Sequence, residues 1–90
     1  MTDRVAEIEH KLRAALQPLK LEIEDESHKH AGHAGARESG GGHFNVTIVS
    51  AAFTGQGLLQ RHRLVYDALG DTMRREIHAL SIRALSPEEA

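Results

Sequence analysis

Cysteine is absent from the 90 residues of this chain. The protein therefore has no disulfide bond, no thiol nucleophile and no thiolate with which to hold a metal by itself. The absence of disulfides gives no reason to place the protein in an oxidising compartment. We therefore expect it in the reducing cytoplasm. A chain of this length supports one modest core, so we predict a single domain over residues 1–90.

Long apolar runs and a strong charge of one sign are missing as well. No stretch approaches the roughly 18 apolar residues that a membrane-spanning helix needs, and the N-terminus lacks the basic and apolar blocks of a signal peptide. We therefore expect no membrane partner. The formal net charge is −2, so any binding of nucleic acid requires a local basic patch.

Catalytic motifs are not found either. The chain has no Gly-x-Ser-x-Gly elbow and no phosphate-binding loop. The adjacent carboxylates of Asp25 and Glu26 fall on a predicted strand and point to opposite faces, which makes them a poor acid–base pair. Ser27 and Ser50 have no base partner in the pattern. We predict a binding protein rather than an enzyme.

Apolar spacing predicts the secondary structure. Spacings of three and four indicate helices over residues 3–16 and 57–69, and Pro18 ends the first of these. Two-residue alternation predicts strands over residues 19–25, 44–49 and 77–84. Asp71 is placed to cap a short helix over residues 72–76. The helix over residues 57–69 and the last strand each carry one apolar stripe, predicted to face the core: Leu58, Leu59, His62, Val65, Tyr66 and Leu69 on the helix, and His78, Leu80, Ile82 and Ala84 on the strand.

The order of these elements predicts the fold class. A helix, two strands, two helices and a strand, with a right-handed crossover before the last strand, give a three-stranded mixed sheet with helices on one face. This is an α+β two-layer sandwich. Residues 28–42 hold five glycines and no large apolar side chain, which predicts a flexible histidine/glycine loop between the first two strands. Residues 86–90 resemble a helix start without a helix behind it, so we expect this tail to fray.

Histidine is the abundant special residue, with seven in the chain. His28, His30 and His33 lie close together in the predicted loop, so two or three imidazoles can reach one ion. Such a cluster also suits adventitious binding of zinc, nickel or copper. For His78, position on an apolar strand face favours a half-buried core residue over a ligand. His43, at the start of the second strand, and His62, on the buried helical stripe, are predicted to be structural.

An ordered series of short motifs resembles the BolA family over roughly residues 5–88. The motifs are Asp25-Glu26-Ser27 with His30, His43-Phe44, Val49-Ser50, Phe53-Thr54-Gly55, Arg61-His62-Arg63-Leu64-Val65-Tyr66 and His78-Ala79-Leu80. The resemblance implies a KH-like fold of the second type. It also implies a monothiol glutaredoxin as partner, with which proteins of this family share a 2Fe–2S cluster.

The same resemblance implies the ligands of that cluster. It assigns one to His78, at the start of the last strand, and a second to His30 in the hairpin loop, which His33 can replace. A chain without cysteine cannot complete the cluster, so the remaining ligands come from the glutaredoxin cysteine and glutathione, and no cluster is expected in the isolated chain. Two imidazoles in place of two thiolates raise the cluster potential, as in Rieske centres. Cluster trafficking and sensing of iron status need the same ligands and are both left open.

The alternative function is that of a DNA-binding transcriptional regulator, which the resemblance suggests for some members. Its surface would include Arg61 and Arg63, predicted to point outward from their helix beside the turn at Gly55. The turn lacks the Gly-x-x-Gly spacing with which KH domains clamp a nucleic-acid backbone. Without a binding role, these arginines would form a solvated helix face. We expect the protein to be a monomer when alone.

Overall fold

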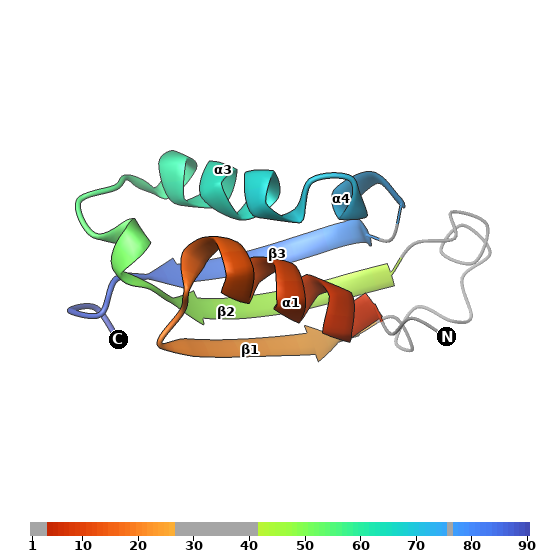
Figure 1. The fold of residues 1–90 in the computed structure, drawn as a ribbon, viewed down its shortest axis with the longest axis horizontal. Coiled ribbons are helices and arrows are strands. Elements are labelled where there is room, and N and C mark those ends of the chain that lie inside the picture. Colours follow the sequence, from red (N-terminus) through yellow and green to blue (C-terminus); the bar gives the residue numbers. More distant parts are fainter. Residues whose placement is uncertain (1–3, 27–41, 76) are drawn as a thin grey trace.

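The computed structural model describes residues 4–26, 42–75 and 77–90. It confirms the predicted order of helices and strands and adds one short 3-10 turn, η2 (Figure 1). The elements are α1 (Arg4–Leu16), β1 (Lys20–Asp25), β2 (Gly42–Val49), η2 (Ala51–Phe53), α3 (Leu58–Leu69), α4 (Thr72–Arg75) and β3 (Ile77–Leu85). The predicted glycine-rich loop lies outside the described residues except for Gly42, which belongs to β2.

The three strands form one mixed sheet in the order β1-β2-β3. Strand β2 lies in the centre, antiparallel to β1 and parallel to β3. Helices α3 and α4 provide the crossover between the two parallel strands, as Figure 1 shows. The predicted α+β sandwich with a three-stranded mixed sheet is confirmed.

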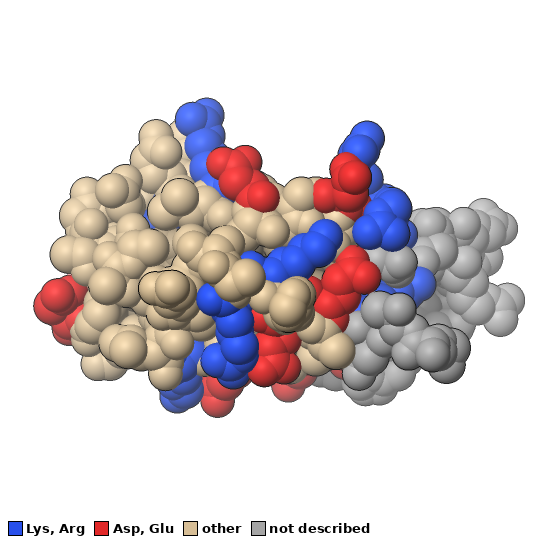
Figure 2. Space-filling model, in the orientation of Figure 1, with Lys and Arg blue, Asp and Glu red and all other residues tan. Residues whose placement is uncertain are grey.

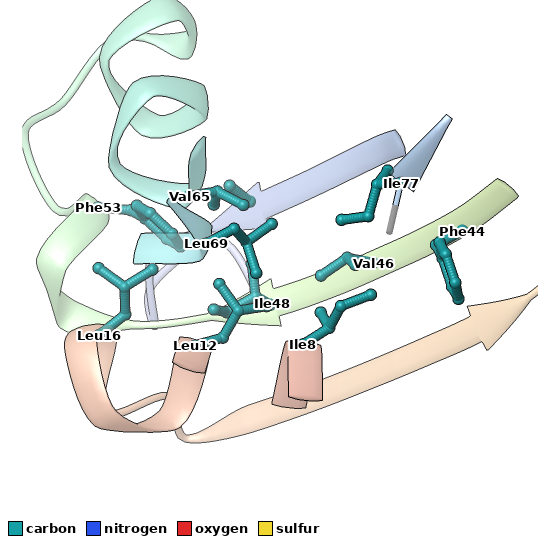
Figure 3. Close-up of a cluster of buried hydrophobic side chains, with 11 residues drawn as sticks. Ile8, Leu12, Leu16, Phe44, Val46, Ile48, Phe53, Val65, Leu69 and Ile77 are labelled. Carbon is teal, nitrogen blue, oxygen red and sulfur yellow. The ribbon is translucent and has the colours of Figure 1, made fainter. Parts of the chain in front are cut away.

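One face of the sheet packs against α1 and α3 (Figure 3). Strand β2 alternates from Phe44 to Ile48, so that every second side chain enters this core. Helix α1 contributes residues four apart, as a helix with one buried stripe must. The buried apolar side chains are Ile8, Leu12, Leu16, Phe44, Val46, Ile48, Phe53, Val65, Leu69, Ile77 and Ala84.

The other face of the sheet is polar, because the residues between the core positions of each strand point there. The strand register places Glu24 opposite Asn45 and Asn45 opposite Ser81 on this face. His43 belongs to the same set, since it precedes the buried Phe44. We call this surface the open face.

The predicted end of the first helix at Pro18 is confirmed. Gln17 leaves the helical region with a φ of 47°, and its N–H donates to the carbonyl oxygen of Arg13. The buried Ser50 then ties this helix end to the end of β2. Its hydroxyl donates to the Leu16 carbonyl (2.7 Å) and accepts from the Ala52 N–H (3.1 Å). Ser50 therefore has a structural role.

Several apolar residues predicted to be buried are exposed. Leu58 and Leu59 are 70% and 63% exposed, and Tyr66 is 40% exposed, whereas Val65 and Leu69 are fully buried. The apolar stripe of α3 runs along the whole helix, but only its C-terminal half meets the core. Leu19 is 74% exposed because it precedes β1 rather than belonging to it.

The C-terminal tail is bonded to the domain, which differs from the predicted fraying. Ser86 is buried, its N–H donates to the Glu89 carboxylate (2.8 Å), and the Glu89 N–H donates back to the Ser86 carbonyl (3.0 Å). This resembles the reciprocal bonding of a helix capping box, formed here by a single turn. A side chain from α3, Arg61, then holds the turn in place.

Candidate functional site

The start of β3 contains an irregularity that places His78. Gly42 pairs with Ile77, but His43 pairs with Ala79, so His78 is an extra residue without a partner on β2. A bulge of this kind shifts the alternation of side chains and re-aims one of them. Ile77 takes the buried position, and His78 is exposed. The prediction that His78 shares the apolar face of its strand is therefore wrong.

His78 lies beside His43. The centres of the two imidazole rings are 5.1 Å apart, and the ring planes are tilted by 43°. His43 belongs to the open face, so the pair lies on that side of the sheet. Simple alternation from sequence could not pair these residues, because only the bulge brings His78 over to His43.

A hollow lies beside His43 at the end of the sheet where β1 stops and β2 starts. It is lined by Glu26, His43, Phe44, Asn45, Ala79 and Ser81. The N–H of Glu26 donates to the His43 carbonyl (2.8 Å), which closes this end of the β1–β2 ladder. The predicted loop ligands His30 and His33, and their neighbour His28, lie outside the described residues.

The pair has the donor set of an incomplete metal site. Across residues 4–26, 42–75 and 77–90, no group of three or more His, Cys, Asp or Glu side chains is placed to hold a metal ion. Two imidazoles alone leave coordination positions to be filled from elsewhere. They suit a borderline metal such as zinc or iron, and one iron of a 2Fe–2S cluster accepts two histidines in Rieske proteins.

The start of β3 is also held from the helical side. The Lys11 ammonium donates to the Thr72 hydroxyl (2.5 Å) and to the Leu69 carbonyl (3.2 Å). The hydroxyl of Thr72, which is fully buried, donates to the Glu7 carboxylate (2.5 Å), and Arg75 lies 3.6 Å from the same carboxylate. This network fixes α4, which leads into β3, against α1.

Arg61 does not point outward as the sequence predicts. Its side chain is only 13% exposed. Its guanidinium donates to the Gln56 carbonyl (2.8 Å) and the Ala84 carbonyl (3.0 Å), and it pairs with the Glu89 carboxylate (2.5 Å). Since every bond joins parts of this chain, Arg61 is a clamp between α3, β3 and the tail.

This clamp lowers the pKa of Glu89 from 4.5 to about 2, because the Arg61 side chain and the Ser86 N–H both bond the ionised carboxylate. A lowered folded-state pKa adds stability above the unfolded value, and that stability is lost as the pH falls toward 2. Glu89→Gln should therefore lower the melting temperature at pH 7, and the difference from wild type should shrink between about pH 4.5 and pH 2. Glu88→Gln, in an exposed position of the same turn, is the control. A difference between Glu89→Gln and wild type that is constant with pH would contradict this assignment.

The remaining residues of the predicted nucleic-acid surface are exposed. Arg63 and Gly55 both lie at the surface, and Gly55 has a φ of 77°, a conformation that favours glycine. Elsewhere the basic side chains are partly matched by acidic ones, as in the pairs Arg13–Glu9 and Arg74–Asp71. Figure 2 shows basic and acidic groups interleaved on the face that it presents. A broad basic patch is not seen on that face.

His62 occupies a partly buried position on α3, as expected for a structural residue. Its ring meets the ring of Tyr66 edge-on, with centres 6.4 Å apart. Among the described residues, its Nε2 atom is buried and has no hydrogen-bond partner.

None of the helices in the described part of the chain is long and apolar enough to cross a membrane.

Comparisons with known proteins agree with the resemblance in sequence. The family described as BolA-like protein matches residues 12–89. The chain is 51% identical to SufE-like protein 1 of Arabidopsis thaliana over 91% of its own length, but it spans only 23% of that relative. It is 43% identical to the DNA-binding transcriptional regulator BolA of Escherichia coli, covering 91% of this chain and 74% of the relative. The solved structure of the BolA domain of SufE1 from Arabidopsis thaliana superimposes with a TM-score of 0.84 at 47% identity, covering 100% of this chain and 99% of that one.

Proposed function

Because this chain belongs to the BolA family, we propose that it is a non-enzymatic adaptor that binds a monothiol glutaredoxin and shares a 2Fe–2S cluster with it through histidines. The observation that supports this proposal best is the exposed position of His78. The bulge in β3 turns its imidazole away from the core and toward a second imidazole, where a partner can reach it.

The ligand balance also supports a shared cluster. A 2Fe–2S cluster takes four protein or small-molecule ligands. This chain has no cysteine, so it offers only imidazoles, and the thiolates must come from the glutaredoxin cysteine and glutathione. We propose His78 as one ligand and keep His30 or His33 from the hairpin loop as the sequence-based proposals for a second.

Imidazole ligation gives the cluster properties that suit exchange. Neutral histidines in place of thiolates raise its reduction potential. The glutaredoxin end keeps its thiolates, so the two ends of the cluster differ in charge. Such a complex suits either delivery of the cluster to a client or sensing of iron status, and we propose the cytoplasm as its compartment.

A spectroscopic titration tests the proposal. The purified chain is added to a cluster-loaded monothiol glutaredoxin with glutathione, and visible absorption and circular dichroism are recorded. We expect a new spectrum that saturates at one chain per cluster. His30→Ala with His33→Ala should abolish it if the loop supplies a ligand, with His10→Ala on the exposed side of α1 as the control.

DNA binding remains a second candidate, because the Escherichia coli relative is named a DNA-binding transcriptional regulator. Arg63 is exposed and available for this role, but Arg61 is engaged within the chain. An unchanged glutaredoxin spectrum, together with DNA binding that weakens steeply with salt, would favour this candidate over the shared cluster.

A further inference from the structure

The first turn of α3 lies at an uncharged, exposed end of the molecule. Residues 51–60 contain no charged side chain, and all of them except Phe53 are exposed. They include Leu58 and Leu59, which are among the most exposed large apolar side chains, and two alanines of η2. Figure 2 shows that this end of the molecule, at the left, is mostly tan. Adjacent exposed leucines without nearby charge suit a binding surface. We call the exposed residues among 51–60 the neutral end.

Arg61 borders the neutral end and forms a carboxylate-binding site. It lies three residues after Leu58 on α3, so the two side chains are neighbours. Its Nε donates to the Gln56 carbonyl (2.8 Å) and its Nη1 to the Ala84 carbonyl (3.0 Å), which fixes the plane of the guanidinium. Nη1 also donates to Oε1 of Glu89 (2.5 Å), and Nη2 donates to Oε2 (3.3 Å). Such two-point contact is the geometry with which arginine recognises carboxylates.

The carboxylate in this site comes from the C-terminal tail. The side chain of Glu89 is 46% exposed, whereas that of Arg61 is 13% exposed. The arginine is therefore held within the fold, and its ligand lies at the surface on a single turn. A carboxylate from another molecule can take the place of Glu89 at little cost to Arg61, because one charge-assisted pair replaces another. Both bonds from Arg61 to backbone carbonyl groups are kept in this exchange.

We propose that the neutral end and Arg61 form a docking surface for a partner protein whose binding segment combines apolar side chains with one carboxylate. In the bound state the apolar side chains cover Leu58 and Leu59, and the carboxylate replaces Glu89 on Arg61. In the free protein Glu89 occupies the site, so it competes with the partner and lowers the apparent affinity.

The chemistry of this surface favours a protein over a nucleic acid. Tight binding of nucleic acid needs several basic groups, because each one neutralises a phosphate. The neutral end has none, and the Arg61 beside it binds a single anion. Protein interfaces, in contrast, are depleted of charged residues at their centre but enriched in arginine. Apolar side chains around one carboxylate are therefore the matching ligand.

The position of the surface suits an adaptor with two partners. Ala84, which accepts a hydrogen bond from Arg61, lies near the end of β3, and His78 lies near its start, roughly 20 Å away along the strand. Figure 1 shows that the start of β3 and the first turn of α3 lie toward opposite ends of the long axis. A partner on the neutral end can thus bind while a glutaredoxin occupies the end with His78. Only this role as a second binding site rests on the proposed function.

Selection of peptides from a displayed random library, with the purified chain as bait, tests the surface. We expect the enriched peptides to combine Asp or Glu with apolar residues. Their affinity, measured by fluorescence anisotropy, should rise several-fold in Glu89→Gln, which removes the competing carboxylate. Glu88→Gln, in an exposed position of the same turn, is the control and should leave the affinity unchanged. The double variant Leu58→Ala with Leu59→Ala should bind roughly tenfold or more weakly.

Replacement of Arg61 by lysine tests the carboxylate site itself. Lysine keeps the charge but cannot bind both oxygens in the same plane, so the affinity for the peptides should fall roughly tenfold or more. Arg63→Lys, in an exposed position of the same helix, should have no effect. Circular dichroism checks that each variant folds. If Arg61→Lys does not fold, Glu89→Gln and the leucine double variant decide the question.

Several results would overturn the docking surface. These are the absence of enriched peptides, enriched peptides without acidic residues, or an affinity that changes neither in Glu89→Gln nor in the leucine double variant. Arg61-dependent binding of random-sequence DNA in place of peptides would assign the surface to nucleic acid. A dimer in sedimentation experiments that the leucine double variant abolishes would assign it to a second copy of this chain.

The glutaredoxin titration separates this inference from the proposed function. The leucine double variant should form the shared spectrum as wild type does. Loss of that spectrum in the folded variant would make the neutral end part of the glutaredoxin interface and would overturn its role as a second site. If the wild-type chain forms no shared cluster, the proposed function fails, and the peptide affinities alone decide whether the docking surface exists.

Discussion

Substitution of His78 by alanine should abolish the shared cluster while leaving the fold intact. His78 is exposed and is the extra residue of a bulge, so its side chain fills no space in the core. Mutation of a residue that only supports a metal ligand typically lowers metal affinity roughly 10- to 100-fold. Loss of the ligand His78 itself should weaken the cluster-bound complex by at least as much. The visible spectrum should return to that of the glutaredoxin alone.

The control for this prediction is His10→Ala, which removes an exposed histidine from α1 on the other side of the sheet. It should leave the shared spectrum unchanged. Both variants should melt close to wild type, since exposed substitutions usually alter stability by about 0.5 kcal/mol or less. A His78→Ala protein that melts normally and still forms the full shared spectrum would exclude His78 as a ligand.

Much of the fold follows from local patterns in the sequence. Two sequence patterns are strong signals: the alternation of β2 around Phe44 and Val46, and the spacing of Ile8 and Leu12 in α1. They are strong because these residues all pack into one continuous core. Pro18 acts through its nearest neighbours, so the end of α1 was predictable. Chain order and the handedness of the crossover then sufficed for the mixed sheet.

The site is less predictable because it depends on pairing between strands. Alternation within β3 places His78 with Leu80 on the core face, and only the register shift against β2 reverses this. The contact between His43 and His78 joins residues far apart in sequence, so neither residue carries a local signal of it. The family resemblance identified His78 by position, but not His43 as its neighbour.

Arg61 illustrates the same limit for a charged residue. Helical periodicity places it away from the apolar stripe, which predicts exposure. Its long side chain instead reaches the carbonyl oxygens of Gln56 and Ala84 and the carboxylate of Glu89. The last of these contacts depends on how the tail folds back, which the sequence around Arg61 does not encode.

Leu12 and Leu58 provide a matched test of which apolar residues form the core. Helical periodicity predicts that both leucines lie on a buried helical face. In the structure Leu12 is fully buried between α1 and the sheet, whereas Leu58 is 70% exposed in the first turn of α3. The same Leu→Ala change therefore removes packed side-chain atoms at one position and solvated atoms at the other.

We expect Leu12→Ala to lower the free energy of unfolding by about 2–5 kcal/mol, because it leaves a cavity as well as losing apolar burial. Leu58→Ala should change it by about 0.5 kcal/mol or less. Denaturant unfolding of both variants measures the difference. Because a 90-residue chain has a small core, the loss in Leu12→Ala should be a large part of the total free energy of unfolding. A comparable loss in Leu58→Ala would mean that the first turn of α3 packs in solution against a surface that its 70% exposure does not show.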